Sequence, residues 1–142
     1  MKKVFFLFTL TFIIGYQSNA QECDSIYRIV SSYIEKSEDG RPFVSDGQTY
    51  MAFLNNEKAE FNTTLFGGTY YRIAASAGTK DDYVIFSIFD LEDNLLFSNR
   101  SFNNIPYWDF KIENTLPVRI ITELDTDKRM TGCAVMMIGF LK

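Results

Sequence analysis

Histidine is absent from the 142-residue sequence, and its absence excludes several kinds of chemistry. A Ser-His-Asp triad, a Cys-His pair and every histidine-ligated metal site are ruled out. No phosphate-binding P-loop, GxGxxG or HExxH motif occurs either. Paired carboxylates, as in glycoside hydrolysis, are the remaining catalytic option, and spacing in one sequence does not reveal them. We therefore expect a protein that is not an enzyme, with a carboxylate-dependent hydrolase as an alternative.

Basic residues are few and do not cluster: 14 lysines and arginines stand against 18 aspartates and glutamates. Two of them, Lys2 and Lys3, precede an apolar run at 4–16, and a polar stretch then ends at Ala20. This pattern is typical of a secretory signal peptide at residues 1–20, cleaved after Ala20. The run of about 13 residues is shorter than the roughly 20 that span a bilayer. A membrane anchor that is never removed is the alternative.

The predicted cleavage leaves residues 21–142, a length that suits one domain with a hydrophobic core. It also removes two lysines, so 12 basic residues remain against 18 acidic ones, a formal charge of −6. Nucleic acid is not an expected partner, because phosphate contacts need clustered lysines and arginines. An acidic chain is also repelled by anionic lipid surfaces. We expect an exported protein, periplasmic or extracellular, that does not insert into a membrane after cleavage.

Only two cysteines are present, Cys23 and Cys133. An exported chain meets an oxidising environment, so we predict a disulfide between them. The disulfide would close a loop of about 110 residues, for which chain entropy predicts about 4 to 5 kcal/mol of stabilisation. Two buried free thiols are the alternative. Neither cysteine lies in a CxxC motif, so the pair is not expected to bind metal.

The segment 24–38 has the spacing of an amphipathic helix. Its apolar side chains recur at intervals of three and four residues: Ile26, Ile29, Val30, Tyr33 and Ile34. Asp24 or Ser25 is the expected N-terminal cap, and Gly40 is the expected left-handed residue beyond the C-terminus. This is the only helix that the pattern predicts after the signal peptide.

From about residue 47 onward, β-branched and aromatic residues fill short runs separated by glycine, asparagine and aspartate. We predict strands at 48–54, 60–66, 69–77, 83–90, 95–101, 108–112, 118–124 and 133–141. Such strands predict a mainly β fold, an eight-stranded antiparallel β-sandwich or jelly roll. The runs 84–89 and 133–141 are apolar on both faces, so we expect the N-terminal helix to pack on their sheet. The disulfide would hold it there.

Aromatic residues are candidates for a binding surface. Trp108 begins a strand in which aromatic and aliphatic residues alternate with charged ones, so we expect it in the core. Tyr50, Tyr70, Tyr71 and Tyr107 could form an exposed face for sugar or peptide. Tyrosine is also an ordinary strand residue with a half-buried ring and a hydroxyl that reaches water. We favour that second interpretation.

Acidic residues provide the weak candidates for a metal site. Asp90 ends one predicted strand and Asp93 lies before the next, and Asp81 and Asp82 lie in the preceding turn. Calcium needs six to eight oxygen ligands, and the EF-hand pattern fails because Leu95 stands where that loop requires glycine. We interpret the Asp90 segment as a hairpin turn, because aspartate and asparagine favour turns. A calcium ion shared by these aspartates is the alternative, and no other cofactor is expected.

A second acidic group comprises Glu123, Asp125 and Asp127 and is followed by Lys128 and Arg129. Charges of both signs partly neutralise one another there. We interpret the group as a solvated strand end and turn.

The order of turns and strands over about residues 60–141 resembles a known family. A strand leads to a turn at Gly67 and Gly68, a tyrosine-bearing strand and an Asp-rich hairpin follow, and Thr131-Gly132 precedes the closing strand. This pattern resembles the pre-peptidase C-terminal type of secreted β-sandwich. The resemblance implies the sandwich fold and names no catalytic residue or ligand.

Our leading hypothesis is a non-enzymatic exported sandwich that binds another protein or a component of the cell envelope. The alternative is a small carbohydrate-binding module, with calcium-assisted binding as one form of it. Neither hypothesis names an individual ligand, because fold alone does not specify function.

Overall fold

A computed structural model describes residues 19–36, 40–78 and 82–141. Most of the predicted signal peptide, residues 1–18, lies outside the described residues, as does Asp81. The elements are α1 (Asn19–Glu35), β1 (Phe43–Asn55), β2 (Lys58–Leu65), β3 (Thr69–Ser76), β4 (Val84–Phe89), β5 (Leu95–Ser98), the short 3₁₀ helix η1 (Asn99–Phe102), β6 (Tyr107–Ile112), β7 (Leu116–Leu124) and β8 (Thr131–Leu141).

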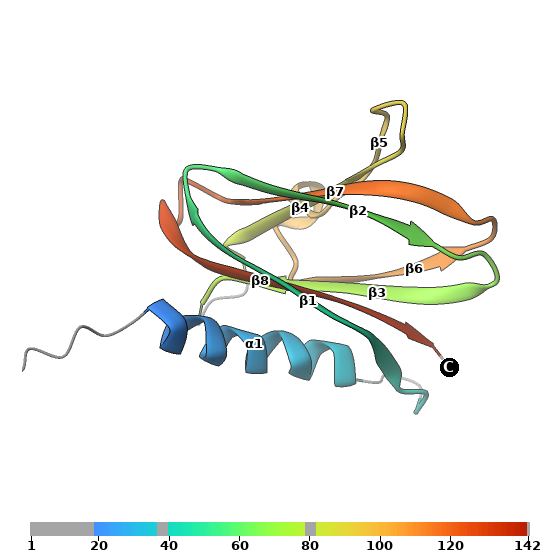
Figure 1. The fold of residues 1–142 in the computed structure, drawn as a ribbon, viewed down its shortest axis with the longest axis horizontal. Coiled ribbons are helices and arrows are strands. Elements are labelled where there is room, and N and C mark those ends of the chain that lie inside the picture. Colours follow the sequence, from blue (N-terminus) through green and yellow to red (C-terminus); the bar gives the residue numbers. More distant parts are fainter. Residues whose placement is uncertain (1–18, 37–39, 79–81, 142) are drawn as a thin grey trace, which may run out of the picture.

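The strands form two four-stranded antiparallel sheets that face each other (Figure 1). The order is β1-β8-β3-β6 in one sheet, here called the helix-side sheet, and β2-β7-β4-β5 in the other, called the solvent-side sheet. The antiparallel pairs β1–β8, β2–β7, β3–β6 and β4–β5 are nested, as in one long hairpin wound into a roll. This arrangement is a jelly roll, so the predicted fold class is confirmed.

The main core lies between the sheets and is built from alternate residues of each strand. Ile73, Phe86 and Ile120 are fully buried in it. Trp108 is partly buried and packs against this core, as predicted. In β2 the side chains alternate in the same way, because Phe61 packs on the core while Glu60 is exposed.

A second core lies between α1 and the outer face of the helix-side sheet (Figure 1). Ile26, Val30 and Ile34 are buried there against apolar side chains of β3 and β8. Each such burial contributes about 2 kcal/mol relative to an exposed side chain. The predicted disulfide is present: Cys23 of α1 is bonded to Cys133 of β8, with their Cα atoms 5.5 Å apart.

The limits of the helix differ from the prediction. α1 runs from Asn19 to Glu35, where 24–38 was predicted. Asp24 therefore lies inside the helix and is not its cap. Gly40 has the expected positive φ of 78°, but it lies beyond the last helical turn and does not cap it. The apolar stripe covers only the helical turns that contact the sheet. It therefore predicted which face of the helix is buried but not where the helix begins and ends.

The strands are also shifted from their predicted limits, and two of them, β1 and β5, depart the most. β1 begins at Phe43, before its predicted start, and contains a bulge: the pairing passes from Ser45 with Gly139 to Thr49 with Met137. Gly47 lies in this bulge with a φ of 86°. An Asp-Gly pair is usually a turn signal, and it concealed the first part of this strand.

The other departure is β5, which ends at Ser98 and is followed by η1, where a strand to residue 101 was predicted. Beyond the end of β5, the buried side chain of Asn99 forms hydrogen bonds to β4 that a longer strand would otherwise form with its backbone. Its Oδ1 accepts a hydrogen bond from the Phe86 N–H, and its Nδ2 donates to the Val84 carbonyl, both at 2.9 Å. Asn99 also begins an Asn-Arg-Ser glycosylation sequon, but its fully buried amide is not accessible to a glycan.

The helix covers only one of the two runs that are apolar on both faces. β8 lies under α1, whereas β4 belongs to the solvent-side sheet, so the expectation that one helix would cover both was wrong. On β4, the Arg119 guanidinium lies 5.2 Å from the centre of the Phe89 ring. A strand that is apolar on both sides indicates that both of its faces are covered, but the sequence does not identify the element that covers each face.

Candidate functional site

The four tyrosines considered as an exposed binding face do not share one face. Tyr71 points into the main core and is 7% exposed, while its neighbour Tyr70 is 41% exposed. Tyr107 packs beside α1, with its ring centre 5.6 Å from that of Tyr33. Tyr50 packs at the margin of the main core. No common platform is formed by these residues, because strand alternation sends successive side chains to opposite faces.

The acidic segment after β4 is a hairpin turn, as interpreted from the sequence. The Asp90 N–H donates to the Asn94 carbonyl at 3.1 Å, and Asp90 Oδ1 accepts hydrogen bonds from the N–H groups of Glu92 and Asn94. The Asn94 side chain also donates to Asp90 Oδ2, and this bond is the main reason that the pKa of Asp90 is lowered. Asp93 has a φ of 64° and forms an ion pair with Arg119.

The aspartates that were weak candidates for calcium ligands are engaged in separate contacts. Asp82 pairs with Lys128 at 2.9 Å, while Asp90 and Asp93 belong to the hairpin turn described above. Asp81 lies outside the described residues. Within the described ranges, no group of three or more cysteine or acidic side chains could hold a metal ion. The calcium alternative therefore remains a prediction, for which the described part of the chain assembles no ligand set.

The second acidic group forms contacts of the kind expected at a strand end and turn. Glu123 lies 2.9 Å from the Lys58 ammonium and 3.3 Å from the Arg100 guanidinium. Asp125 accepts a hydrogen bond from the Asn104 side chain at 2.8 Å. Ion pairs at such exposed positions contribute about 0 to 1 kcal/mol each, so they are weak support for a functional site.

Arg72 is a buried residue whose role the sequence did not reveal. It is 2% exposed and donates to the Asp109 carboxylate through Nε and Nη2 at 2.6 and 2.7 Å. Its Nη1 donates to the carbonyls of Tyr33 and Lys36 at the C-terminal end of α1. The guanidinium also lies over the Phe43 ring, 4.3 Å from its centre. Arg72 thus fastens the end of the helix to the helix-side sheet.

Arg129 has a matching role at the other end of α1. It pairs with Glu22 of the helix and donates to the Ala77 carbonyl at 2.6 Å and to the Thr131 carbonyl at 2.9 Å. The sequence interpretation had placed it in a solvated turn. Both arginines contact parts of the chain far from them in sequence, and for this reason local patterns did not predict their partners.

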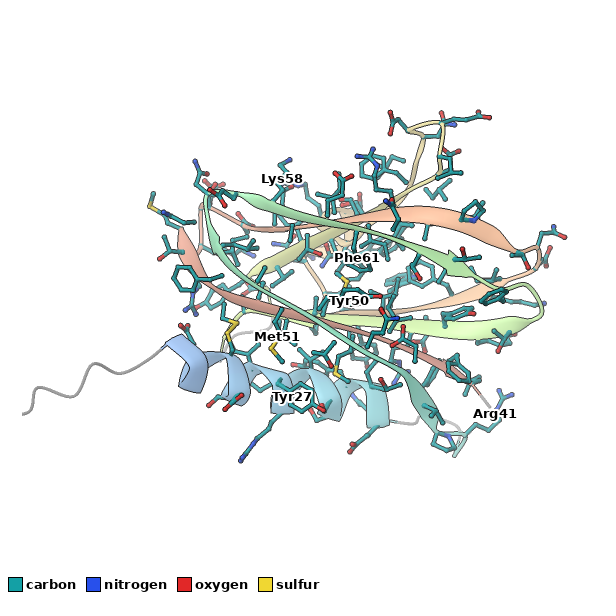
Figure 2. The ribbon with its side chains drawn as sticks, viewed as in Figure 1. Tyr27, Arg41, Tyr50, Met51, Lys58 and Phe61 are labelled. Carbon is teal, nitrogen blue, oxygen red and sulfur yellow. A yellow bond between two sulfur atoms is a disulfide. The ribbon has the colours of Figure 1, made fainter. Side chains whose placement is uncertain are left out.

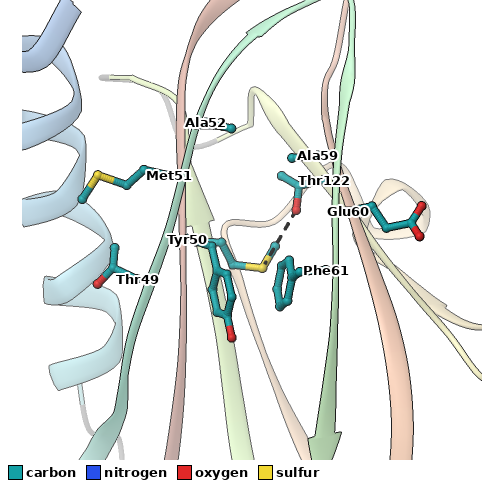
Figure 3. Close-up of a pocket in the computed structure, with 10 residues that line it drawn as sticks. Thr49, Tyr50, Met51, Ala52, Ala59, Glu60, Phe61 and Thr122 are labelled. Atoms are coloured by element: carbon teal, nitrogen blue, oxygen red, sulfur yellow. Dashed lines mark hydrogen bonds between the residues drawn. The ribbon is translucent and has the colours of Figure 1, made fainter.

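A cleft opens between the two sheets where β1 and β2 form their edges (Figure 3). Ala52 of β1 and Ala59 of β2 point toward one another across this gap. Their small side chains leave a space of about 300 Å³, which we call the alanine slot. Thr122 of β7 and Met136 of β8 line the slot from inside the sandwich. The side chains of both sheets therefore contribute to one concave site.

An aromatic pair bounds one end of the alanine slot. The rings of Tyr50 and Phe61 are stacked, with centres 3.7 Å apart and planes inclined by 12°. The Tyr50 hydroxyl donates to Gln48 Oε1 at 2.7 Å. Burial raises the pKa of Tyr50, and the negative charge of Asp46 raises it further. Tyr50 is therefore a neutral phenol at physiological pH. Through its stacking on Phe61, it also joins the two sheets at their edges.

The inner wall of the slot holds one polar group among apolar ones. Thr122 is 5% exposed, and its hydroxyl donates only to the sulfur of Met136, at 3.9 Å. Thioether sulfur is a weak acceptor, so a ligand oxygen could take its place at little cost. Glu60 and Met51 also border the opening, but their side chains point away from it (Figure 3). The slot thus suits an apolar group with at most one or two polar atoms.

The sequence contains a partial signal for the slot. Tyr50 and Ala52 alternate on β1, as do Ala59 and Phe61 on β2, so each strand places a large and a small side chain on its inner face. Which inner residue of one strand faces which of the other depends on how the two sheets pack. Strand alternation alone therefore could not predict that the two alanines would meet.

No family model matches this chain, and no curated protein matches it in sequence. The resemblance to the pre-peptidase C-terminal family therefore stays a prediction. Among the described residues, no helix is both long enough and apolar enough to cross a membrane. Jelly rolls carry many unrelated functions, so the argument for function has to come from the site.

Proposed function

We propose that the protein is an exported, non-catalytic binding module and that the alanine slot is its ligand site. One observation carries the proposal: an apolar opening of about 300 Å³ penetrates between the two sheets. Ligand sites are concave, mostly apolar and contain a few oriented polar groups. The slot has apolar walls, the stacked Tyr50 and Phe61 at one end, and the Thr122 hydroxyl inside.

Export is supported by the Cys23–Cys133 disulfide, because such bonds persist in oxidising compartments. The predicted signal peptide points the same way. The absence of histidine from the sequence supports a non-catalytic role, since the commonest general base is missing. The partner on this proposal is a protein or an envelope component that presents an apolar group. The carbohydrate alternative has less support, because its four tyrosines do not share a face.

A fluorescent apolar probe tests the proposal directly. N-phenyl-1-naphthylamine would be titrated into the exported protein with its disulfide intact, and its emission would increase on entering the slot. Ala59→Leu places a larger side chain in the slot, and we expect at least a tenfold loss of probe affinity. Thr64→Leu is the matched control, because it adds the same side chain at an exposed position of β2. Equal probe binding by Ala59→Leu and the native protein would refute the assignment.

A further inference from the structure

We infer that the free edge of β1 at residues 49–55 accepts an extended apolar segment of another polypeptide as an added strand, with one of its side chains in the alanine slot. This inference rests on the proposed function, since it names the occupant of the same site. In strand addition, main-chain hydrogen bonds supply affinity, and pockets for alternate side chains supply specificity.

The four edge strands of the two sheets differ in how they are protected. An edge strand exposes unpaired N–H and C=O groups, and proteins usually protect it with charges, proline, a bulge or short length. β2 carries Lys58 and Glu60 as exposed side chains, and β6 carries Asp109 and Lys111. β5 has only four residues. Three of the four edge strands are therefore protected in one of these usual ways: β2 and β6 by charges, and β5 by its short length.

β1 is protected along only part of its length. Its bulge at residues 46–48 interrupts the pairing with β8, and Asp46 adds a charge there. Beyond the bulge, residues 49–55 pair continuously with β8 and contain no charged residue and no proline. The sequence of this stretch is Thr-Tyr-Met-Ala-Phe-Leu-Asn. This part of the edge is long, regular and available for pairing with another strand.

Both faces of the sheet beside this edge offer apolar surface to an added strand. On the inner face lies the alanine slot. On the outer face, Met51 is 48% exposed and Phe53 is 50% exposed, and Tyr27 is exposed on α1, the helix that packs against this sheet (Figure 2). Side chains of an added strand alternate between the two faces, so one set would enter the slot and the other would cover Met51 and Phe53. A free small molecule in the slot would leave the outer residues uncovered.

The size of the apolar surface selects a short segment over a second copy of this chain. A fully exposed aromatic side chain offers about 150 to 250 Å², so half-exposed Phe53 offers on the order of 100 Å², and the smaller Met51 offers no more than that. Stable protein pairs bury about 800 Å² on each partner. The patch falls well below that area. An extended segment of five to seven residues needs less, because its backbone also pairs with β1.

The charge of the protein adds a preference for the segment. After the predicted cleavage the chain carries a formal charge of −6, so a partner with basic residues beside its apolar core would associate faster. The expected partner is therefore an extended polypeptide segment that is apolar on both faces and flanked by lysine or arginine.

A library of random linear heptapeptides displayed on phage provides the probe. The library would be selected on the immobilised exported protein, and enriched peptides would be synthesised with blocked ends. We expect enriched sequences with consecutive apolar residues. Ala59→Leu should weaken their binding at least tenfold through the slot, and Met51→Lys should weaken it through the outer face. Thr64→Leu should leave it unchanged.

N-methylation of the enriched peptides tests the main-chain pairing. Successive amides of a strand point to opposite sides, so methylating alternate amides should abolish binding in one of the two phases and spare it in the other. A peptide held by its side chains alone would respond to both patterns alike.

Three outcomes would overturn the inference. They are a library that yields no enriched peptide, enriched peptides whose binding survives Ala59→Leu and Met51→Lys, and a β1-mediated dimer of the protein in sedimentation, which would make a second copy the occupant. If the naphthylamine probe binds the slot but no peptide does, the slot stands and strand addition fails. If neither binds, the proposed function fails with it.

Discussion

The two long edges of the sandwich are closed to different degrees. At the edge formed by β5 and β6, the space between the sheets is filled by rings: Phe97, Phe102, Trp108 and Phe110. At the edge formed by β1 and β2, one stacked pair joins the sheets, and two alanines beside it leave a gap. The same architecture is thus sealed on one side and open on the other.

The closed edge contributes packing that stabilises this jelly roll, whereas the open edge leaves room for a ligand. Phe97 contacts rings on both sides, with centres 5.3 Å from Trp108 and 4.9 Å from Phe110. Aromatic pairs of this kind add about 0.5 to 1.5 kcal/mol each beyond the area they bury. Ala52 and Ala59 have no ring and make no aromatic contacts of this kind. A chain under selection for stability alone would be expected to fill the gap at Ala52 and Ala59.

The largest effect is expected from opening the closed edge. Phe97→Ala removes the ring at the centre of the aromatic cluster. We expect the free energy of unfolding to fall by about 3 kcal/mol. This value is at the lower end for a buried phenylalanine, because Phe97 is only partly buried. Urea unfolding followed by circular dichroism measures the loss. Tyr50→Ala at the open edge is the comparison and should cost less. An equal cost at both edges would show that they are not different in packing.

An intermediate effect is expected from closing the open edge. Ala59→Leu should raise the free energy of unfolding by about 1 kcal/mol, because it buries added methyl groups in space that is already present. The same urea titration measures it, with Thr64→Leu as the control at an exposed position. A loss of stability would instead mean that the slot is too narrow for a leucine, as in an overpacked core.

The smallest effect concerns the charge beside the open edge. Burial raises the pKa of Asp46, while its hydrogen bond from the Gln48 N–H opposes that rise. The folded state therefore binds this proton more tightly than the unfolded chain, so stability from Asp46 is present below the ordinary pKa and lost as pH rises through the folded pKa. Asp46→Asn should stabilise the protein slightly at pH 7, within about 0.5 kcal/mol.

The pH dependence provides the check on that last prediction. The gain from Asp46→Asn should shrink as the pH falls toward the raised pKa of Asp46, where its carboxylate in the native protein becomes protonated. Thermal unfolding midpoints of both proteins between pH 3 and 7 would measure it. Asp127→Asn, in an exposed turn, is the control. A gain that stays constant over this range would contradict the cause assigned to Asp46.

Several features were predictable because their signals are local. Ile26, Val30 and Ile34 follow the period of a helix that packs on one face, and the structure buries all three. Alternation in β6 likewise predicted that Trp108 faces the core. The pairing of Cys23 with Cys133 followed from there being only two cysteines in a chain expected to be exported.

The candidate site was less predictable because its parts come from different strands. In the sequence, Tyr50 is one of four tyrosines that could form a binding face, and no pattern assigns a role to Ala52 or Ala59. Alanine has no polar group and no strong strand preference, so it carries no functional signal by itself. The acidic residues carried a stronger signal, yet the structure places Asp90 in a turn and pairs Asp93 with Arg119.

By itself, the sequence determined the kinds of element and the faces that they bury, because periods of 2 and 3.6 residues act within short segments. The tertiary structure decided which distant residues meet. Arg72 reaches the end of α1, and Ala52 faces Ala59, only because of how the helix and the sheets pack. Contacts between separate elements depend on the relative positions of whole sheets, and no local periodicity encodes those positions.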